Sequence, residues 1–145
     1  MHLFDVIVIL CTGSMVGNEL AVSLFVNPAI WENDDHAMAS RLAGSLGKFM
    51  PFWYAVSLIF IAVEAYLRRG QPGEPLLLIA AGGWVASIVF SLAALVPINN
   101  RLAADGPGST RGEWRTEHSR WDTLHRWRVV LLFAATACLV GGILD

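Results

Sequence analysis

The stretch LLLIAAGGWVASIVFSLAALVPI, residues 76–98, contains no charged side chain and is long enough to cross a lipid bilayer as an α-helix. Working outward from it, we predict three further helices of this kind over about residues 4–26, 49–67 and 120–144. Each approaches the roughly 20 residues that a hydrocarbon core requires. The sequence therefore predicts an all-α protein, a four-transmembrane-helix bundle.

The composition agrees with one integral membrane domain over residues 1–145. The chain is 55% hydrophobic and 15% charged, whereas a soluble domain carries roughly 25% charged residues. Its net charge of −2 offers no basic field for nucleic acid. Cys11 and Cys138 lie in apolar stretches without CxxC spacing, which indicates small buried residues and not a thiol oxidoreductase. The predicted partner is the lipid bilayer, and the sequence leaves an oligomer open.

The distribution of basic residues predicts an orientation. Four spans put the loops 27–48 and 99–120 on one side of the membrane, and eight of the ten Lys and Arg residues lie on that side. Only Arg68 and Arg69 lie on the other side. The positive-inside rule therefore places the two longer loops in the cytoplasm and both termini outside.

Small residues recur at four-residue steps in two of the predicted helices. Gly83, Ser87 and Ser91 share one face of the third helix, and Gly13 and Gly17 repeat the spacing in the first. Small side chains allow neighbouring backbones to approach closely. We expect both faces to be packing surfaces.

Glu19 lies well inside the first predicted helix, where an ionised carboxylate costs at least a few kcal/mol. Thr12, Ser23 and Asn27 fall on the same helical face, which must look into the bundle and not at lipid. Two interpretations stay open. Glu19 is either a neutral side chain hydrogen-bonded between helices or part of a ligand, proton or metal site.

A second polar stripe precedes the apolar part of the fourth helix. His118, Trp121, Asp122, His125 and Arg128 recur at three- and four-residue steps, so they share one face if the helix begins early. The alternative is an amphipathic collar at the membrane surface.

Further polar residues are expected on the same side of the membrane. Asn99 and Asn100 follow the third helix, where they either cap backbone groups near Pro97 or orient a substrate. His36 lies in the first loop. Above Glu19, one mouth of the bundle is therefore predicted to gather Asn27, His36, Asn99, Asn100, His118, His125 and Arg128.

Two of these segments resemble a known family. The run Val96-Pro97-Ile98-Asn99-Asn100-Arg101-Leu102, followed by Trp121-x-x-x-His125-x-x-Arg128 and an apolar helix, resembles the anthrone oxygenase-like family of small four-helix membrane proteins. The resemblance implies a membrane enzyme of the bacterial inner membrane that oxygenates a polyphenolic anthrone to the anthraquinone. It also implies that no organic cofactor is needed and that the partner is a small apolar or aromatic molecule.

The resemblance covers only part of the expected site. Asn99, Trp121, His125 and Arg128 occupy matching motif positions, whereas Glu19, His36 and His118 come from burial and spacing. The predicted catalytic residues are His125, Arg128 and Glu19. The predicted substrate-binding residues are Asn99, Asn100, Trp121 and Asn27.

The expected chemistry begins with removal of a proton from an acidic phenol or anthrone carbon by His125 or Glu19. The carbanion then reacts with oxygen, while Arg128 and Asn99 stabilise the developing oxyanions and Trp121 forms an apolar wall. In a metal-assisted variant, an ion would be bound by some of four residues whose spacing matches no dedicated metal motif. These four are Glu19, His36, His118 and His125.

Two other classes of function remain open. Small multidrug-resistance transporters also have four short helices with an essential Glu in the first, so a proton-coupled transporter using Glu19 is one alternative. A non-catalytic membrane scaffold subunit, whose polar residues only pack, is the other. The long third loop, with its His and Trp residues, favours the enzyme over the transporter.

Overall fold

The computed structural model describes residues 2–104 and 111–145, and these residues form helices joined by short turns. Two of the helical segments, η1 and η2, are π-helical and the others are α-helical. In chain order the elements are α1 Leu3–Ala21, η1 Val22–Val26, α2 Asn27–Asn33, α3 His36–Leu67, α4 Glu74–Phe90, η2 Ser91–Leu95, α5 Val96–Ala104 and α6 Arg111–Leu144.

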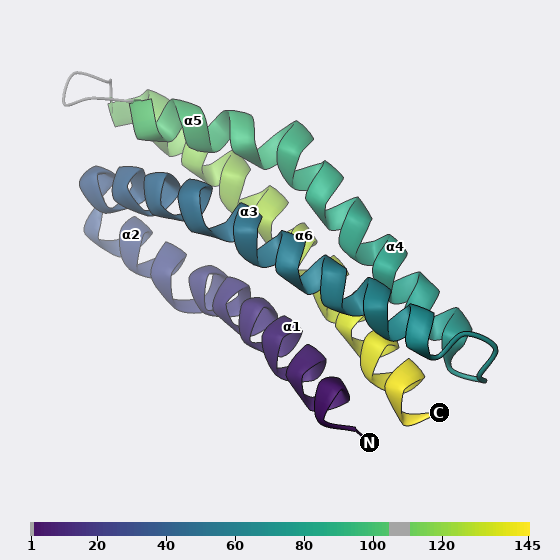
Figure 1. The fold of residues 1–145 in the computed structure, drawn as a ribbon. Coiled ribbons are helices and arrows are strands. Elements are labelled where there is room, and N and C mark those ends of the chain that lie inside the picture. The colour runs from purple at the N-terminus through teal and green to yellow at the C-terminus, as the bar shows by residue number, and fades with distance from the viewer. Residues whose placement is uncertain (1, 105–110) are drawn as a thin grey trace.

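These elements form four long rods, which confirms the all-α bundle with four membrane-spanning helices. Both termini and the turn between α3 and α4 lie at one end of the bundle, and α2 and α5 lie at the other (Figure 1). Each rod is longer than the bilayer requires, since its 29 or 31 residues span about 44–46 Å against a hydrocarbon core of about 30 Å. The helices suited to span a membrane are Leu3–Asn33, Ala37–Leu67, Glu74–Leu102 and Trp114–Leu144.

The prediction that residues 27–48 and 99–120 form loops is wrong, because the rods continue through most of both segments. A left-handed Asp34, with φ 52°, turns the chain after α2, and Asp35 caps α3 by accepting a hydrogen bond from the Met38 N–H at 2.8 Å. The fourth rod likewise begins at Arg111, well before residue 120. Helices do not stop where apolar sequence stops, because polar residues are tolerated on the turns that extend beyond the hydrocarbon core.

Pro28 and Pro97 lie inside the rods, and each follows a π-helical turn. Pro28 comes two residues after η1, and Pro97 comes two residues after η2. A proline ring clashes with the carbonyl four residues earlier and leaves that carbonyl without its usual donor. In both cases this carbonyl belongs to the π turn, where the wider winding shifts the backbone. Each rod therefore continues past its proline with a local irregularity.

The interior contains two apolar clusters with a polar layer between them. The cluster nearer the termini includes Val16, Tyr54 and Leu132, and the other includes Val22 and Trp121. Glu19, Ser87 and Arg128 are buried at positions between these clusters along their helices. The polar layer is therefore enclosed at both ends by packed hydrophobic side chains.

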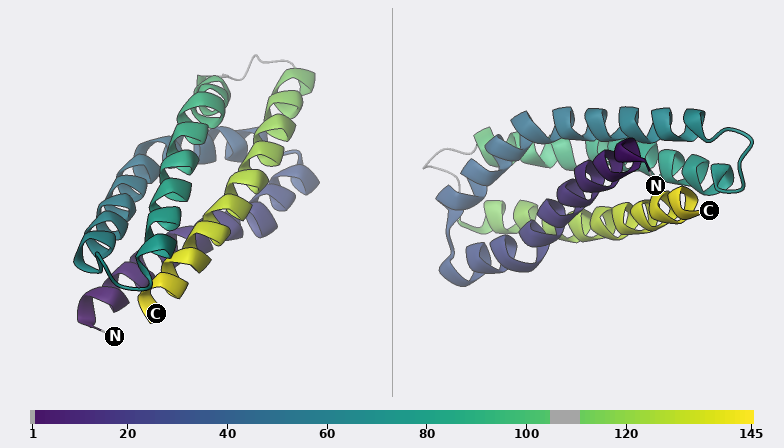
Figure 2. Two further views of the ribbon diagram at one scale, coloured as in Figure 1. Left: turned by 90° about the vertical axis from the view of Figure 1, so that its right-hand side faces the viewer. Right: turned by 60° about the horizontal axis from the view of Figure 1, so that its bottom comes forward.

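Near the termini an ion-pair cluster joins the first two rods. Arg68 lies 2.5 Å from Glu64 and 3.1 Å from Asp5, so α1 and α3 are tied together where they begin and end. The views in Figure 2 show the oblique course of α1 across the bundle.

The packing expected of Gly83 is confirmed, because a Cβ at this position would lie 2.9 Å from the Cβ of Ala135. Helices α4 and α6 form the most extensive contact in the bundle. The same expectation is wrong for Gly13 and Gly17, which are exposed and have no neighbour within 4 Å of an added Cβ among the described residues. Equal spacing in sequence did not reveal which face points inward.

We predict that Gly83→Leu destabilises the bundle by about 1–3 kcal/mol, because its side chain must displace Ala135 from the α4–α6 contact. Gly82→Leu is the matched control, since Gly82 is exposed and open. Reversible unfolding in mixed micelles measures both free energies of unfolding. Equal stability of the two variants would contradict the tight contact.

Candidate functional site

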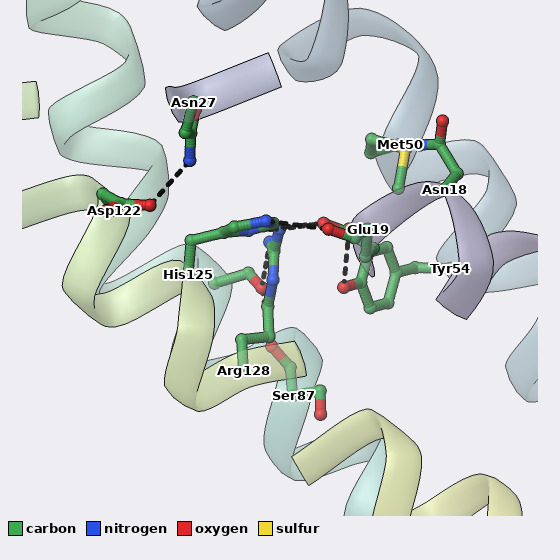
Figure 3. A network of polar contacts seen from close by, with 10 residues as sticks. Asn18, Glu19, Asn27, Met50, Tyr54, Ser87, Asp122, His125 and Arg128 are labelled. Atoms are coloured by element: carbon green, nitrogen blue, oxygen red, sulfur yellow. Dashed lines mark hydrogen bonds and ion pairs between the residues drawn. The ribbon is translucent and has the colours of Figure 1, made fainter. Parts of the chain in front are cut away.

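A buried ion pair joins the first and last rods. Glu19 Oε2 lies 2.7 Å from Arg128 Nη2, and the two side chains are 1% and 8% exposed (Figure 3). The guanidinium remains charged in proteins, so the carboxylate facing it is favoured as its counter-ion. The geometry therefore argues against the interpretation of Glu19 as a neutral side chain that is only hydrogen-bonded between helices.

Tyr54 of α3 holds the other oxygen of the same carboxylate. Its hydroxyl donates to Glu19 Oε1 at 3.0 Å, and its ring lies 5.6 Å from the Arg128 guanidinium carbon. Arg128 thus has an anion on one side and an aromatic face on another. The hydroxyl, the carboxylate and the guanidinium come from three different rods.

His125 is fully buried, and its contacts determine which ring nitrogen carries the proton. Nε2 lies 3.1 Å from the Glu19 backbone carbonyl, which can only accept, so Nε2 donates. Nδ1 lies 3.0 Å from Arg128 Nη2 and 3.4 Å from Glu19 Oε2. Because the guanidinium can only donate, Nδ1 accepts from it. His125 is therefore a neutral imidazole that orients Arg128.

Ser91 completes the support of Arg128 from the third rod. Arg128 Nη1 donates to Ser91 Oγ at 3.0 Å, and the Ser91 hydroxyl donates to the Ser87 carbonyl at 2.7 Å. Ser91 is the first residue of η2, while η1 begins three residues after Glu19. Both π turns thus adjoin the ion pair, and π turns are frequent at functional sites. Ser91, expected on a packing face, thus also binds Arg128.

An aromatic column extends from His125 along the inner face of α6. The Trp121 ring stacks on His125 with centroids 4.6 Å apart and planes 9° apart, and His118 stacks on Trp121 at 6.0 Å. Trp31 of α2 lies 5.0 Å from His118. All five residues predicted to share a stripe are buried, which confirms that the helix begins early and that the stripe faces inward. These residues are His118, Trp121, Asp122, His125 and Arg128.

A cavity of about 230 Å³ adjoins the ion pair on the side of α3 and η2. Tyr54, Ser91 and Arg128 belong both to the network and to the cavity wall. Glu19 and His125 are not among the described lining residues, so they lie behind the wall. The lining consists of Leu46, Gly47, Met50, Pro51, Tyr54, Ala55, Ile88, Ser91, Leu92, Leu95, Val96, Asn99, Trp121 and Arg128.

The predicted substrate-binding residues lie in different places. Asn99 and Trp121 line the cavity, whereas Asn100 is exposed on α5 and is not among the described lining residues. Asn27 is buried and donates to Asp122 Oδ1 at 2.8 Å, outside the described cavity wall. Of the residues predicted to gather at one mouth of the bundle, Asn99 and Arg128 line the cavity, whereas Asn27 and Asn100 are not among its described lining residues.

The predicted metal ligands do not come together as a metal site. Among the described residues, no three His, Cys, Asp or Glu side chains are grouped to hold an ion, and the His36 side chain lies outside the described part. Glu19 and His125 do adjoin, but Arg128 binds both of them. His118 lies beyond the Trp121 ring. A guanidinium in contact with both candidate ligands opposes a second cation, so these residues do not fit a metal.

Tyr54 is the main functional candidate that the sequence analysis missed. It lies on a buried face of α3 together with Met50, Ser57 and Ile61, where a tyrosine resembles an ordinary core residue. The available signal was a phenol hydroxyl in the middle of a span, which needs a partner when buried.

A known protein family matches this chain. The profile described as anthrone oxygenase matches residues 40–138, more than half of the chain. The chain belongs to the anthrone oxygenase family. No curated protein and no solved structure matches it. The match to the anthrone oxygenase family includes Tyr54, Asn99 and Arg128, whereas Glu19 precedes it.

We predict that Glu19→Gln or Arg128→Met alone destabilises the bundle by about 3–5 kcal/mol, because each leaves one buried charge without its partner. The double variant should lose clearly less than the sum of the two. A double-mutant cycle on the free energy of unfolding measures this coupling.

The exposed pair Arg101–Glu117 is the control, since its side chains are 51% and 30% exposed at 2.8 Å. Its own cycle, with Arg101→Met and Glu117→Gln, should give a coupling of at most about 1 kcal/mol. Additive losses at Glu19 and Arg128 would show that these two residues do not form an ion pair.

Proposed function

We propose that this protein is a membrane-embedded oxygenase that oxidises an acidic aromatic molecule, anthrone-like or hydroquinone-like, in the cavity beside Arg128. The observation that carries the proposal is that Arg128, whose guanidinium is fixed by Glu19 and His125, is one of the residues that line the cavity. A fixed cation at an apolar cavity stabilises an anion that water would otherwise have to solvate. Membership of the anthrone oxygenase family supports an oxygenase-like role.

The proposed reaction converts a ring methylene into a ketone. Loss of a proton from an anthrone CH₂ gives an enolate, which transfers one electron to O₂, and the two radicals combine as a carbon-bound peroxide. Protonation gives a hydroperoxide, and loss of water from it leaves the carbonyl. The balance is anthrone plus O₂ to anthraquinone plus water, so the protein has to manage protons and an anion.

Tyr54 and Glu19 are the proposed proton relay. Tyr54 lines the cavity and its hydroxyl donates to Glu19, so the hydroxyl can accept a substrate proton while its own proton passes to the carboxylate. Of the two bases expected from the sequence, this proposal selects Glu19, acting through Tyr54, in place of His125. His125 is instead a positioning residue, because Arg128 and Trp121 lie against it and it is fully buried.

Arg128 and Asn99 are the proposed oxyanion partners. Arg128 would stabilise the enolate and then the peroxide, and the Asn99 amide would bind the ring oxygen from α5. Trp121 would provide the flat apolar surface against which an aromatic ring packs.

The transporter alternative gains no support from the surroundings of Glu19. A proton-coupled carrier needs its carboxyl group to face the path of the substrate, whereas Glu19 is not among the described lining residues of the cavity. A scaffold would need no cavity beside this network. We propose a bacterial inner membrane location, with α2 and α5 toward the cytoplasm.

We predict that Tyr54→Phe lowers kcat for anthrone oxidation by about 10²-fold or more, because it removes the hydroxyl that relays the proton. Oxygen uptake by purified protein in nanodiscs measures this, after subtraction of spontaneous oxidation over heat-inactivated protein. The matched control is Tyr66→Phe, since Tyr66 is 74% exposed on the same helix.

Labelled oxygen distinguishes an oxygenase from an oxidase. With ¹⁸O₂, the proposed reaction places one labelled atom in the quinone and one in water. Full activity of Tyr54→Phe, or unlabelled quinone with formation of hydrogen peroxide, would contradict the proposal.

A further inference from the structure

Three polar atoms on residues of the cavity wall are buried without a hydrogen-bond partner among the described residues. They are Asn99 Oδ1, Trp121 Nε1 and Arg128 Nε. Buried polar groups are nearly always paired, and an unpaired one costs about 1–3 kcal/mol. Three such atoms on residues around one cavity of 230 Å³ therefore indicate a polar ligand.

The chemistry of these atoms selects the ligand. The indole and guanidinium N–H groups can only donate, whereas the Asn99 oxygen can only accept. A phenolic hydroxyl does both, because its oxygen accepts from N–H groups while its hydrogen is donated to the amide. A hydrocarbon would leave all three atoms unpaired, and an ammonium group would oppose the guanidinium.

The volume limits the size of the apolar part. A cavity of about 150 Å³ lined by aliphatic and aromatic side chains binds benzene, and drug-sized ligands occupy about 300–1,000 Å³. At about 230 Å³ this cavity has room for one more fused ring than benzene, and a third ring would have to extend outside it.

The outer rim of the cavity faces the bilayer. Its exposed lining residues are apolar and lie on two neighbouring rods: Gly47, Pro51 and Ala55 on α3, and Leu92 on η2. All four lie within helices suited to span the membrane. An apolar ligand dissolved among the lipid chains can therefore reach the cavity sideways, between α3 and η2.

We infer that the cavity binds a two-ring phenol of the 1-naphthol type, which comes from the lipid between α3 and η2 and places its hydroxyl among Asn99, Trp121 and Arg128. This inference rests on the proposed function for the reaction that follows. The keto tautomer of 1-naphthol carries a ring methylene, and the same chemistry gives 1,4-naphthoquinone. The balance is C₁₀H₈O plus O₂ to C₁₀H₆O₂ plus water.

Binding tests the inference without turnover. Radiolabelled 1-naphthol and naphthalene are titrated under argon into nanodiscs that carry the protein, and empty nanodiscs measure partition into lipid. We expect 1-naphthol to bind about tenfold more tightly than naphthalene, because only the phenol pairs the buried atoms. Trp121→Phe and Asn99→Leu should reduce that ratio by several-fold, because each removes a polar group that pairs with the hydroxyl and leaves an apolar side chain that still packs against naphthalene.

A second pair of variants tests the sideways route. Ala55→Phe places a ring at the rim and should weaken 1-naphthol binding, whereas Ala62→Phe, exposed elsewhere on α3, should not. Circular dichroism and elution volume confirm that both variants are folded.

Each outcome separates the inference from the proposed function. Equal affinity for naphthalene and 1-naphthol, or equal effects of Ala55→Phe and Ala62→Phe, would overturn the inference. Oxidation of anthrone by a protein that does not bind 1-naphthol would overturn it and leave the proposed function standing. Specific binding of 1-naphthol without oxygen uptake on any substrate would support the inference and contradict the proposed function.

Discussion

Two opposite charges, on Glu19 of α1 and Arg128 of α6, lie 2.7 Å apart between two apolar clusters of the bundle. Removing both charges from water costs several kcal/mol each, and their attraction compensates only when further hydrogen bonds complete the arrangement. Tyr54, Ser91 and His125 supply these bonds, one from each remaining rod and one from α6 itself. The pair thus determines which residues meet at this depth.

The backbone is shaped around the same layer. The π turns η1 and η2 each precede a proline and each adjoin one end of the network, η1 after Glu19 and η2 at Ser91. A π turn inserts one residue into the helical repeat. If each π turn were regular α-helix, the residues beyond it would therefore point in other directions around the helix axis. Asn27 and Asn99 follow these turns, so their positions beside the site depend on them.

The sequence predicted the number of spans and the inward face of α6, because apolar length and three- to four-residue spacing are direct consequences of bilayer thickness and helix geometry. It also identified Glu19 as a carboxylate that is costly to bury and placed Arg128 on the polar stripe of the fourth helix. It did not identify Tyr54, since a tyrosine within an apolar helix has no distinctive pattern. Asn100 was grouped with Asn99, although adjacent helical residues face different directions, and Asn100 is exposed.

The rods also end later than the apolar stretches do, and this difference has a physical reason. The bilayer limits where apolar surface is needed, while helix ends are set by caps such as Asp35 and by the left-handed Asp34. Hydropathy therefore predicts the membrane-embedded portion of a helix and not its full length. Trp31 and His118 of the aromatic column lie in that additional length, and Trp121 connects them to the ion pair through His125.

The central claim is that Glu19 and Arg128 are both charged inside the bundle. Infrared difference spectroscopy of protein labelled with ¹³C at the Glu side chains, wild type minus Glu19→Gln in lipid at neutral pH, measures the protonation of this one carboxyl group. The account predicts that the substitution removes a carboxylate band and that the band is perturbed in Tyr54→Phe, which loses the hydrogen bond to Oε1. Loss of a protonated carboxylic acid band instead would show that Glu19 is neutral and would contradict the ion pair on which the proposed chemistry depends.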